Sequence, residues 1–313
     1  MDLPTFIIGG VRRGGSTSLY HAIHQHPDIF LYPHSELNYF VEQEVIGRKW
    51  RATPADPDGW EASHSIKDYA KLFVNGTKAR AIGHKGADLL FWQPAHARMA
   101  RFIPNARFIF TLRDPLKRAW SHYGIECAKG RETLSFEKAL AVEDERSTKS
   151  DWARFHLSYR ARGFYDVQLQ RFFEIFPNER VLVITLEETI AQPRETLQQV
   201  YRFLGVNPEL GLDAAGTRKK KSWSTVRRPW TLHRGIRQLV DGYELATGAI
   251  SKLLIRSKEP RRMMRNKLQR SFRMPVQGVT IPEECRAELN TIYAPHIAAL
   301  ESLLNRSFDA WKY

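Results

Sequence analysis

The chain has 313 residues, of which 42% are hydrophobic and 12% aromatic, and its formal net charge is +14. This composition is typical of a globular protein, and no stretch reaches the roughly 18 to 20 consecutive apolar residues of a membrane-spanning helix. The two cysteines, Cys127 and Cys285, are too few for a disulfide framework or a zinc cluster, and the first residues lack the basic leader and apolar core of a secretory signal. We therefore expect ordinary thiols and a cytoplasmic location.

Along the chain, short apolar runs alternate with segments of helical spacing. The predicted strands are residues 4–8, 28–33, 79–85, 106–115 and 180–188. The predicted helices are residues 14–26, 94–103, 116–130, 135–145, 163–176, 193–206 and 281–304, the last as one or two helices. Pro94 suits the first position of its helix, and Ser135 suits an N-cap. Strands that alternate with helices of about 10 to 15 residues predict a three-layer α/β/α fold with a central parallel sheet.

Residues 218–273 interrupt this alternation and carry the net charge of the chain. The window holds 17 Lys/Arg against three acids, which accounts for the whole excess of +14. Such a segment attracts phosphate, sulfate, anionic lipid or nucleic acid, although a solvated surface face is an equally good interpretation. We predict one domain, residues 1–313, with a basic, mainly helical insertion at about 218–280.

The first strand leads into a glycine-rich loop, "GGVRRGGSTSL", at residues 9–19. A strand, a glycine-rich turn and a helix together suit an anion, because the backbone comes close and the N–H groups of the helix N-terminus point at the oxyanion. A triphosphate-binding loop also needs a lysine before its Ser/Thr, and Gly15 or Ser16 stands at that place in the two registers. The loop therefore predicts an anion other than a magnesium triphosphate. The alternative is a turn that binds nothing.

A second signal is "TLRDPLKRAWSHYG", at residues 111–124. Arg113 falls at the end of a predicted strand, where ligands collect in open α/β sheets, and Ser121 follows about two helical turns later. The guanidinium of Arg113 can bind a phosphate through two N–H groups, and Ser121 can donate one more hydrogen bond. The alternative is a surface ion pair between Arg113 and Asp114.

The two stretches together resemble the sulfotransferase superfamily that uses 3′-phosphoadenosine 5′-phosphosulfate (PAPS). "RGGSTSL" is similar to its 5′-phosphosulfate loop, K-x-G-T-T-S-L, and the second stretch is similar to its 3′-phosphate motif, LRDPxxRAxSHY. "QHPDIFLYPHSELNYF" resembles the segment that carries the acceptor-activating glutamate, and the resemblance covers residues 4–206 and 281–311. It is closest to the bacterial and heparan-sulfate-type branch, and it implies the sulfotransferase fold with a P-loop-like strand–loop–helix.

The resemblance implies a donor site on both motifs. It assigns the 5′-phosphosulfate to the loop and the 3′-phosphate to Arg113 and Ser121. The loop residues concerned are Arg12, Arg13, Gly14, Gly15, Ser16, Thr17 and Ser18. A basic loop of the insertion is expected to close on the 3′-phosphate through Lys219, Lys220, Lys221 and Ser222.

The resemblance also implies the catalytic residues. Glu36 is the general base, and Arg13 takes the place of a catalytic lysine. Arginine can stabilise the charge on the bridging oxygen but is a poor proton donor, because its pKa lies above about 12. Lys85 falls near the E-K-T-P stretch of the family and is expected to contact the sulfuryl oxygens. His84, which replaces the glutamate of that stretch, is a second candidate base, with a structural role as the alternative.

The expected reaction is in-line, metal-independent transfer of a sulfuryl group from PAPS to a hydroxyl or amine, leaving adenosine 3′,5′-bisphosphate. The expected acceptor is a glycan, glycolipid or other small metabolite, and residues 218–273 would recruit an anionic or lipid-linked acceptor and contact a membrane surface peripherally. The apolar residues in this window also suit core-facing helix stripes. A kinase-like nucleotide enzyme, a basic nucleic-acid-binding protein and a cofactor-binding relic without turnover are the alternatives. Nucleic acid is not expected as a partner, and the oligomeric state is left open.

Overall fold

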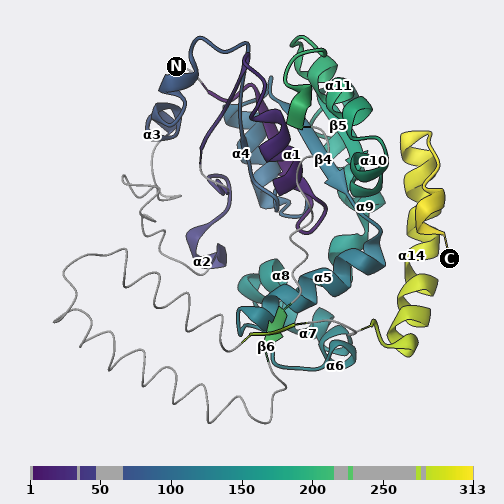
Figure 1. Ribbon diagram of the computed structural model, residues 1–313. Coiled ribbons are helices and arrows are strands. Elements are labelled where there is room, and N and C mark those ends of the chain that lie inside the picture. Colours follow the sequence, from purple (N-terminus) through teal and green to yellow (C-terminus); the bar gives the residue numbers. More distant parts are fainter. Residues whose placement is uncertain are drawn as a thin grey trace, which may run out of the picture.

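The computed structural model describes residues 3–33, 36–46, 66–214, 225–227, 273–275 and 280–312. Its centre is a sheet of five parallel strands in the order β2-β3-β1-β4-β5. Strands β4 and β5 of this sheet are labelled in Figure 1. The strands are β1 (Phe6–Gly10), β2 (Ile29–Leu31), β3 (Ala81–Lys85), β4 (Arg107–Leu112) and β5 (Val181–Thr185). All five predicted strands are confirmed, each within a few residues of its predicted bounds.

Helices cover both faces of the sheet, so the predicted three-layer α/β/α fold is confirmed. The helices are α1 (Ser16–Ile23), α2 (Gln43–Ile46), α3 (Ile66–Lys71), α4 (Pro94–Phe102), α5 (Pro115–Ala128), α6 (Phe136–Ala141), α7 (Glu143–Lys149), α8 (Asp151–Leu157), α9 (Tyr165–Phe173), α10 (Leu186–Ala191), α11 (Pro193–Leu204) and α14 (Glu283–Leu304). Helices α4 and α9 pack on one face, where Phe108 contacts Phe172. Helices α1 and α11 pack on the other face around Ile8 and Ile109. Successive side chains of a strand point to opposite faces, which is why one strand supplies both cores.

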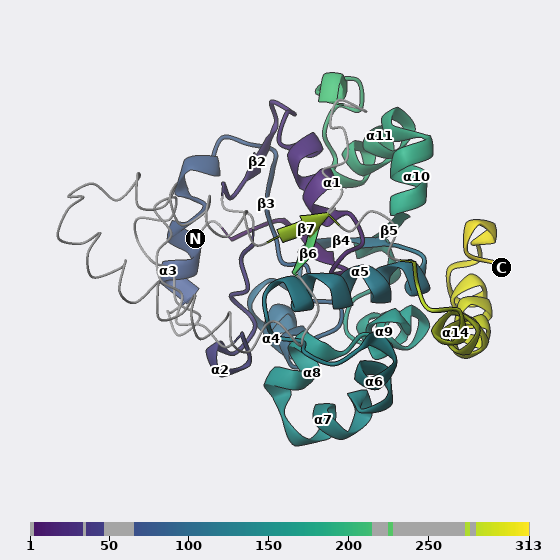
Figure 2. The same ribbon diagram turned by 60° about the horizontal axis from the view of Figure 1, so that its bottom comes forward.

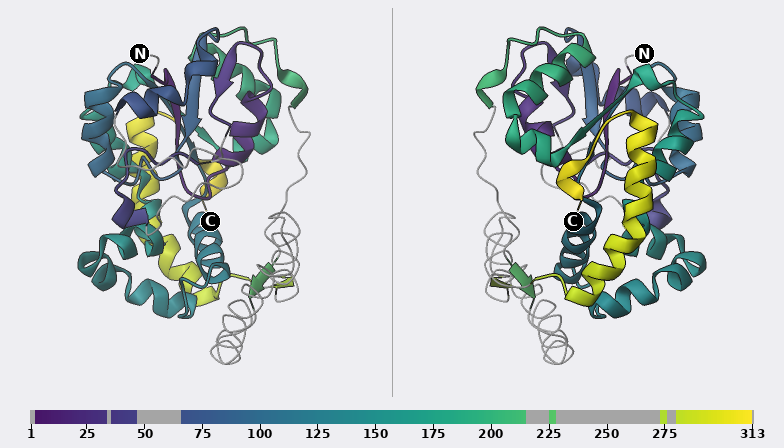
Figure 3. Two further views of the ribbon diagram at one scale, coloured as in Figure 1. Left: turned by 90° about the vertical axis from the view of Figure 1, so that its left-hand side faces the viewer. Right: turned by 90° about the vertical axis from the view of Figure 1, so that its right-hand side faces the viewer.

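A third cluster of helices lies beyond the carboxyl ends of the strands. It contains α5 to α8, and its core includes Leu116, Phe136 and Tyr159 together with Leu289 and Tyr293 of α14. Helix α14 runs alongside both this cluster and α9 of the sheet layers (Figure 3). Helices therefore cover the carboxyl edge of the sheet, and the side chains that follow the strands at this edge are partly buried.

Several helix boundaries follow from local chemistry. Pro94 occupies the first turn of α4, and the Ser135 hydroxyl accepts a hydrogen bond from the backbone N–H of Lys138, so both predicted starts are confirmed. The prediction of one helix over residues 135–145 is wrong, because α6 ends at Ala141 and α7 begins at Glu143. The strand predicted over residues 180–188 ends at Thr185, whose side chain forms a capping box with Glu188 and starts α10.

Within the predicted insertion at 218–280, the structure describes residues 225–227, 273–275 and 280. Strands β6 (Thr225–Arg227) and β7 (Arg273–Pro275) pair in antiparallel register, with Arg227 opposite Arg273. Strand β6 lies against α5 (Figure 2). The two described strands of this segment thus lie together, with β6 beside α5, and the prediction that the segment is mainly helical lies outside the described residues.

Candidate active site

The topology gathers basic residues at one edge of the sheet. Arg12 and Arg13 follow β1, Lys85 is the last residue of β3, and Arg113 follows β4. These three strands are neighbours in the sheet and run parallel, so their carboxyl ends lie side by side. Ligands of open α/β sheets bind outside this edge. Residues that are up to 101 positions apart in the sequence therefore border the same space.

The loop between β1 and α1 is shaped for close contact with a ligand. A Cβ atom on Gly14 would lie 2.0 Å from the carbonyl oxygen of Thr111, and Gly15 has a φ of +102°. Both positions therefore need glycine. Helix α1 begins at Ser16, which is buried, whereas Thr17 and Ser18 are exposed. In this first turn the N–H of Ser18 donates to the carbonyl oxygen of Gly15 at 2.8 Å, whereas the N–H groups of Ser16 and Thr17 have no acceptor within the helix and are available to an anion.

Arg13 and Arg113 converge with Ser121 on one side of this loop. Arg13 Nε donates to Ser121 Oγ at 2.9 Å, and Arg113 Nη1 lies 3.5 Å from the carbonyl oxygen of Arg13. Within the described part of the chain, neither guanidinium forms an ion pair with a carboxylate. Burial, together with repulsion from Arg113, Arg118 and Arg12, lowers the pKa of Arg13 to about 10. Glu187 and Asp114 attract the charge of Arg113 without an ion pair, whereas Arg13 has only other guanidinium groups near it, and this excess of positive charge fits a dianionic phosphate bound from outside.

Asp114 does not pair with Arg113, which was the alternative reading of this motif. Its side chain caps α5 by accepting from the backbone N–H of Lys117 at 3.1 Å, and Lys117 Nζ lies 2.8 Å from the same carboxylate. Asp114 therefore positions the helix that carries Ser121. The Arg113 side chain, held beside the loop, keeps its capacity for a ligand.

Glu36 and Lys85 meet on the other side of the loop. Lys85 Nζ donates to Thr17 Oγ1 at 3.0 Å and to Glu36 Oε1 at 3.2 Å. The Lys85 side chain is buried, whereas that of Glu36 is 35% exposed. Burial raises the pKa of Glu36 even though Lys85 opposes the shift. A carboxylate with a raised pKa is a stronger base, and Lys85 joins this one to Thr17 of the glycine-rich loop.

His84 is not brought to this site. It precedes Lys85 in β3, so its side chain points to the opposite face of the sheet. It is fully buried, its Nε2 lies 2.7 Å from the Tyr69 hydroxyl, and it packs near Phe73. Burial lowers its pKa to about 4. The position supports the structural alternative for His84.

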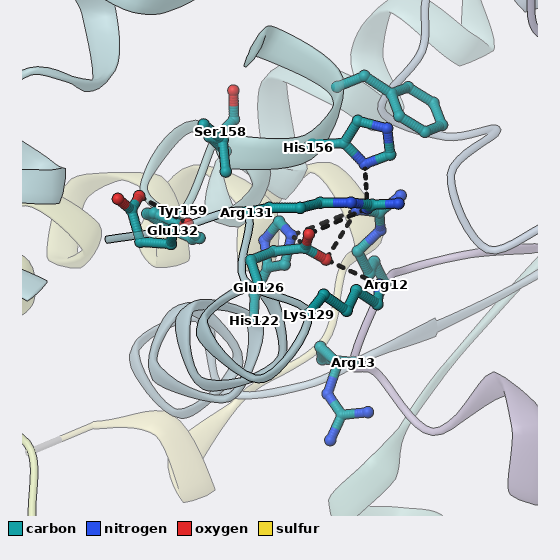
Figure 4. A network of polar contacts seen from close by, with 12 residues as sticks. Arg12, Arg13, His122, Glu126, Lys129, Arg131, Glu132, His156, Ser158 and Tyr159 are labelled. Atoms are coloured by element: carbon teal, nitrogen blue, oxygen red, sulfur yellow. Dashed lines mark hydrogen bonds and ion pairs between the residues drawn. The ribbon is translucent and has the colours of Figure 1, made fainter. Parts of the chain in front are cut away.

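Arg12 points away from its neighbour Arg13 (Figure 4). Its Nε and Nη2 donate to the two carboxylate oxygens of Asp88 at 2.8 and 2.7 Å. Asp88 also accepts from Arg162 at 2.8 Å. The structure thus gives Arg12 a protein partner, where the sequence predicted a bound donor. Asp88 and Arg162 were missed because no local pattern marks them, and Asp88 lies 76 residues from Arg12 in the sequence.

The remaining predicted donor residues, Lys219, Lys220, Lys221 and Ser222, lie outside the described residues. Among the helices that the structure describes, none is long and apolar enough to cross a membrane. The same ranges of the chain contain no cluster of three or more His, Cys, Asp or Glu side chains arranged to hold a metal ion.

Comparisons with known proteins identify relatives of the chain. A family model described as "Sulfotransferase family" matches residues 4–209. The chain is 25% identical over 225 residues to mouse bifunctional heparan sulfate N-deacetylase/N-sulfotransferase 4, covering 69% of this chain and 24% of that protein. It is 25% identical over 209 residues to mouse heparan sulfate glucosamine 3-O-sulfotransferase 3B1, covering 66% and 47%. The chain thus spans less than half the length of these two relatives.

A solved structure gives the same result over nearly the whole chain. The crystal structure of a sulfotransferase from Alicyclobacillus acidocaldarius superposes with a TM-score of 0.67 at 25% sequence identity and covers 99% of both chains. The family model spans the sheet, the phosphate loop and the Arg113–Ser121 motif. The chain belongs to the sulfotransferase family.

Proposed function

We propose that this protein transfers a sulfuryl group from PAPS to a hydroxyl or amine acceptor. The observation that carries the proposal is the set of cations at the carboxyl edge of the sheet, in which Arg13 and Arg113 have no carboxylate partner among the described residues. A donor with two separate anionic ends suits cations on both sides of the loop, with Arg13 and Arg113 on one side and Lys85 on the other. The kinase-like and nucleic-acid-binding alternatives lose their support, because the chain belongs to the sulfotransferase family.

The donor would lie across the glycine-rich loop. The N–H groups of the first turn of α1 and the hydroxyl groups of Thr17 and Ser18 would hold the 5′-phosphosulfate. Arg113 and Ser121 would hold the 3′-phosphate, with Arg13 between the two ends because it already contacts Ser121. Lys219 to Ser222 remain predicted donor ligands. The contact between β6, which follows them in the sequence, and α5, which carries Ser121, supports this prediction.

Glu36 would act as the general base. It would take the proton of the acceptor hydroxyl or amine while the acceptor atom forms a bond to sulfur and the bond from sulfur to the 5′-phosphate oxygen breaks. The leaving group is adenosine 3′,5′-bisphosphate. Arg13 and Lys85 would stabilise the negative charge that accumulates on the transferred group and the leaving oxygen. Lys85 also orients Glu36 through their hydrogen bond.

The acceptor class is proposed from the relatives of the chain and from the charge of its insertion. The relatives named above act on heparan sulfate by their names, and the insertion at 218–280 is strongly basic. We therefore propose an anionic glycan, and a lipid-linked glycan at a membrane surface is the second candidate. The cytoplasmic location and the independence from metal ions stay predictions from composition and family resemblance.

Two measurements test the proposal. Isothermal titration calorimetry in EDTA should detect binding of adenosine 3′,5′-bisphosphate, and a response only to Mg-ATP would contradict it. Incubation with 35S-labelled PAPS and a panel of acceptors should then label one class, with a mass gain of one SO₃. Labelling of neutral phenols but not of glycans would refute the proposed acceptor class while leaving the donor assignment intact.

A further inference from the structure

A buried carboxylate behind the phosphate loop has no role in the proposed chemistry. Asp88 lies in the turn after β3, is 3% exposed, and joins Arg12 of the loop to Arg162 of the short 3-10 turn Ala161–Gly163. We propose that Asp88 is a positioning residue: it anchors the loop through Arg12 and so sets the donor-binding geometry of Arg13 and of the first turn of α1. This inference rests on the proposed donor site.

The contact between Arg12 and Asp88 is directional. Both carboxylate oxygens accept from Arg12, at 2.8 and 2.7 Å, which fixes the orientation of the guanidinium as well as its distance. Arg162 donates to Oδ1 at 2.8 Å and is itself stacked over Phe91, 4.0 Å from the ring centroid. Arg12 of the loop is thus bound to Asp88, and Asp88 is itself bound by the buried Arg162.

The groups around Arg12 hold its guanidinium within the protein. Glu126 Oε1 lies 3.7 Å from Arg12 Nη1, and His122 Nε2 lies 3.4 Å from the same nitrogen. Burial and the nearby guanidinium groups hold the pKa of His122 well below its usual value, so this ring is neutral and can accept. Burial opposes the charge of Asp88, but Arg12 and Arg162 outweigh it and hold the pKa of this carboxyl well below its usual range. Arg12 therefore has carboxylate partners within the protein: Asp88, and Glu126, which it shares with Lys129 and Arg131 (Figure 4).

The anchor acts on the neighbouring residue through the backbone. Arg13 has a φ of +72°, a left-handed conformation that is unusual for a residue with a side chain. This conformation directs the Arg13 side chain to Ser121 while that of Arg12 goes to Asp88. The side chains of two consecutive arginines are therefore held on opposite sides of the loop. Loss of the Asp88 contact would free the Arg12 side chain and let the backbone of Arg13 leave its left-handed conformation.

A purely structural ion pair predicts a different result from a positioning residue, and a mutant cycle separates the two. The proteins are wild type, Asp88→Asn, Arg12→Gln and the double variant. The control is Glu132→Gln, because Glu132 is equally buried and pairs with Arg146 at 2.8 Å but does not contact the loop. The readouts are the Kd of adenosine 3′,5′-bisphosphate by calorimetry, the Tm, and hydrogen exchange of the peptide spanning residues 9–19.

We expect each single variant to raise the Kd about tenfold and the double variant to raise it by no more than either single one, because the two residues act as one unit. Exchange of the loop peptide should be faster in these three proteins. Glu132→Gln should lower the Tm and leave both the Kd and the loop exchange unchanged.

Three outcomes would overturn the inference. An unchanged Kd in folded Asp88→Asn removes Asp88 from the role. An additive, about hundredfold loss in the double variant would show that Arg12 contacts the donor independently of Asp88. A wild-type protein that does not bind the bisphosphate would remove the proposed donor site and this inference together.

Arg12→Lys covers the case in which Asp88→Asn does not fold. It keeps the charge at the edge of the network but loses the two-point contact, so we expect it to weaken binding nearly as much as Arg12→Gln. Wild-type affinity in Arg12→Lys would overturn the inference.

Discussion

Arg12 and Arg13 are adjacent in one loop, yet they end in opposite electrostatic environments. Arg12 is held by Asp88 and lies near Glu126, whereas Arg13 contacts Ser121 and two further guanidinium groups raise the local positive charge. A buried cation without a counter-ion is costly unless a ligand supplies one. The side of the loop with a counter-ion therefore supports its shape, and the side without one is where we propose that an anion binds.

The same contrast holds between His84 and Lys85 on β3. His84 is enclosed with Tyr69 on one face of the sheet, whereas Lys85 bridges Thr17 and Glu36 on the other. In both pairs, one residue supports the fold and its neighbour faces the proposed donor site. Variants on either side of this division should affect different quantities.

The largest expected effect is on turnover, in Glu36→Gln. Loss of the general base should lower kcat at least about a hundredfold, while the Kd of the bisphosphate stays within about twofold. Glu42→Gln is the matched control, because Glu42 follows six residues later in the sequence but pairs with Arg98 and Trp92. Single-turnover kinetics with labelled donor measure the rate. Wild-type turnover in folded Glu36→Gln would remove this residue from the role.

The next effect is on donor affinity, in Arg113→Ala. Removing a charge-assisted contact should weaken the bisphosphate by about 1.5 to 3 kcal/mol, which is about 10- to 150-fold in Kd. Arg107→Ala tests the opposite end of the same strand, where an arginine is exposed and far from the phosphate loop. Calorimetry should show a loss in the first variant only. Equal affinities in both variants would contradict the 3′-phosphate assignment.

A smaller effect concerns pH. Glu36 must be ionised to act as a base, and burial raises its pKa, so the acid limb of kcat/KM should lie above pH 4.5, the ordinary value for this carboxyl. Lys85 lowers the pKa of Glu36, so Lys85→Met should move the limb to higher pH as well as reduce the rate. A pH profile of both proteins measures the midpoints. A shift to lower pH in Lys85→Met would break the proposed coupling.

The smallest effect on catalysis is expected for His84→Gln. The change disturbs a buried hydrogen bond with Tyr69 and should cost about 1 to 3 kcal/mol of unfolding free energy. Turnover should stay within about twofold of wild type, because the residue lies across the sheet from Glu36. Urea unfolding and initial rates test this pair of expectations. A tenfold loss of turnover in a fully folded variant would return His84 to the chemistry.

Much of the architecture was predictable, because strand and helix patterns are local. The apolar run of β4, the proline at the start of α4 and the glycine-rich loop each indicate their structure within about ten residues. The break between α6 and α7 was not predictable, since the helical spacing continues across Val142.

The sequence by itself determined the order of strands and helices, the anion-binding loop and, through family resemblance, the candidate roles of Glu36, Arg113 and Ser121. Only the tertiary structure decided which of two adjacent basic residues faces a ligand. Arg12 and Arg13 have the same chemistry, and the partners that separate them, Asp88 and Ser121, lie 76 and 108 residues away. Contacts at such separations come from the pairing order of parallel strands, which local sequence patterns do not encode.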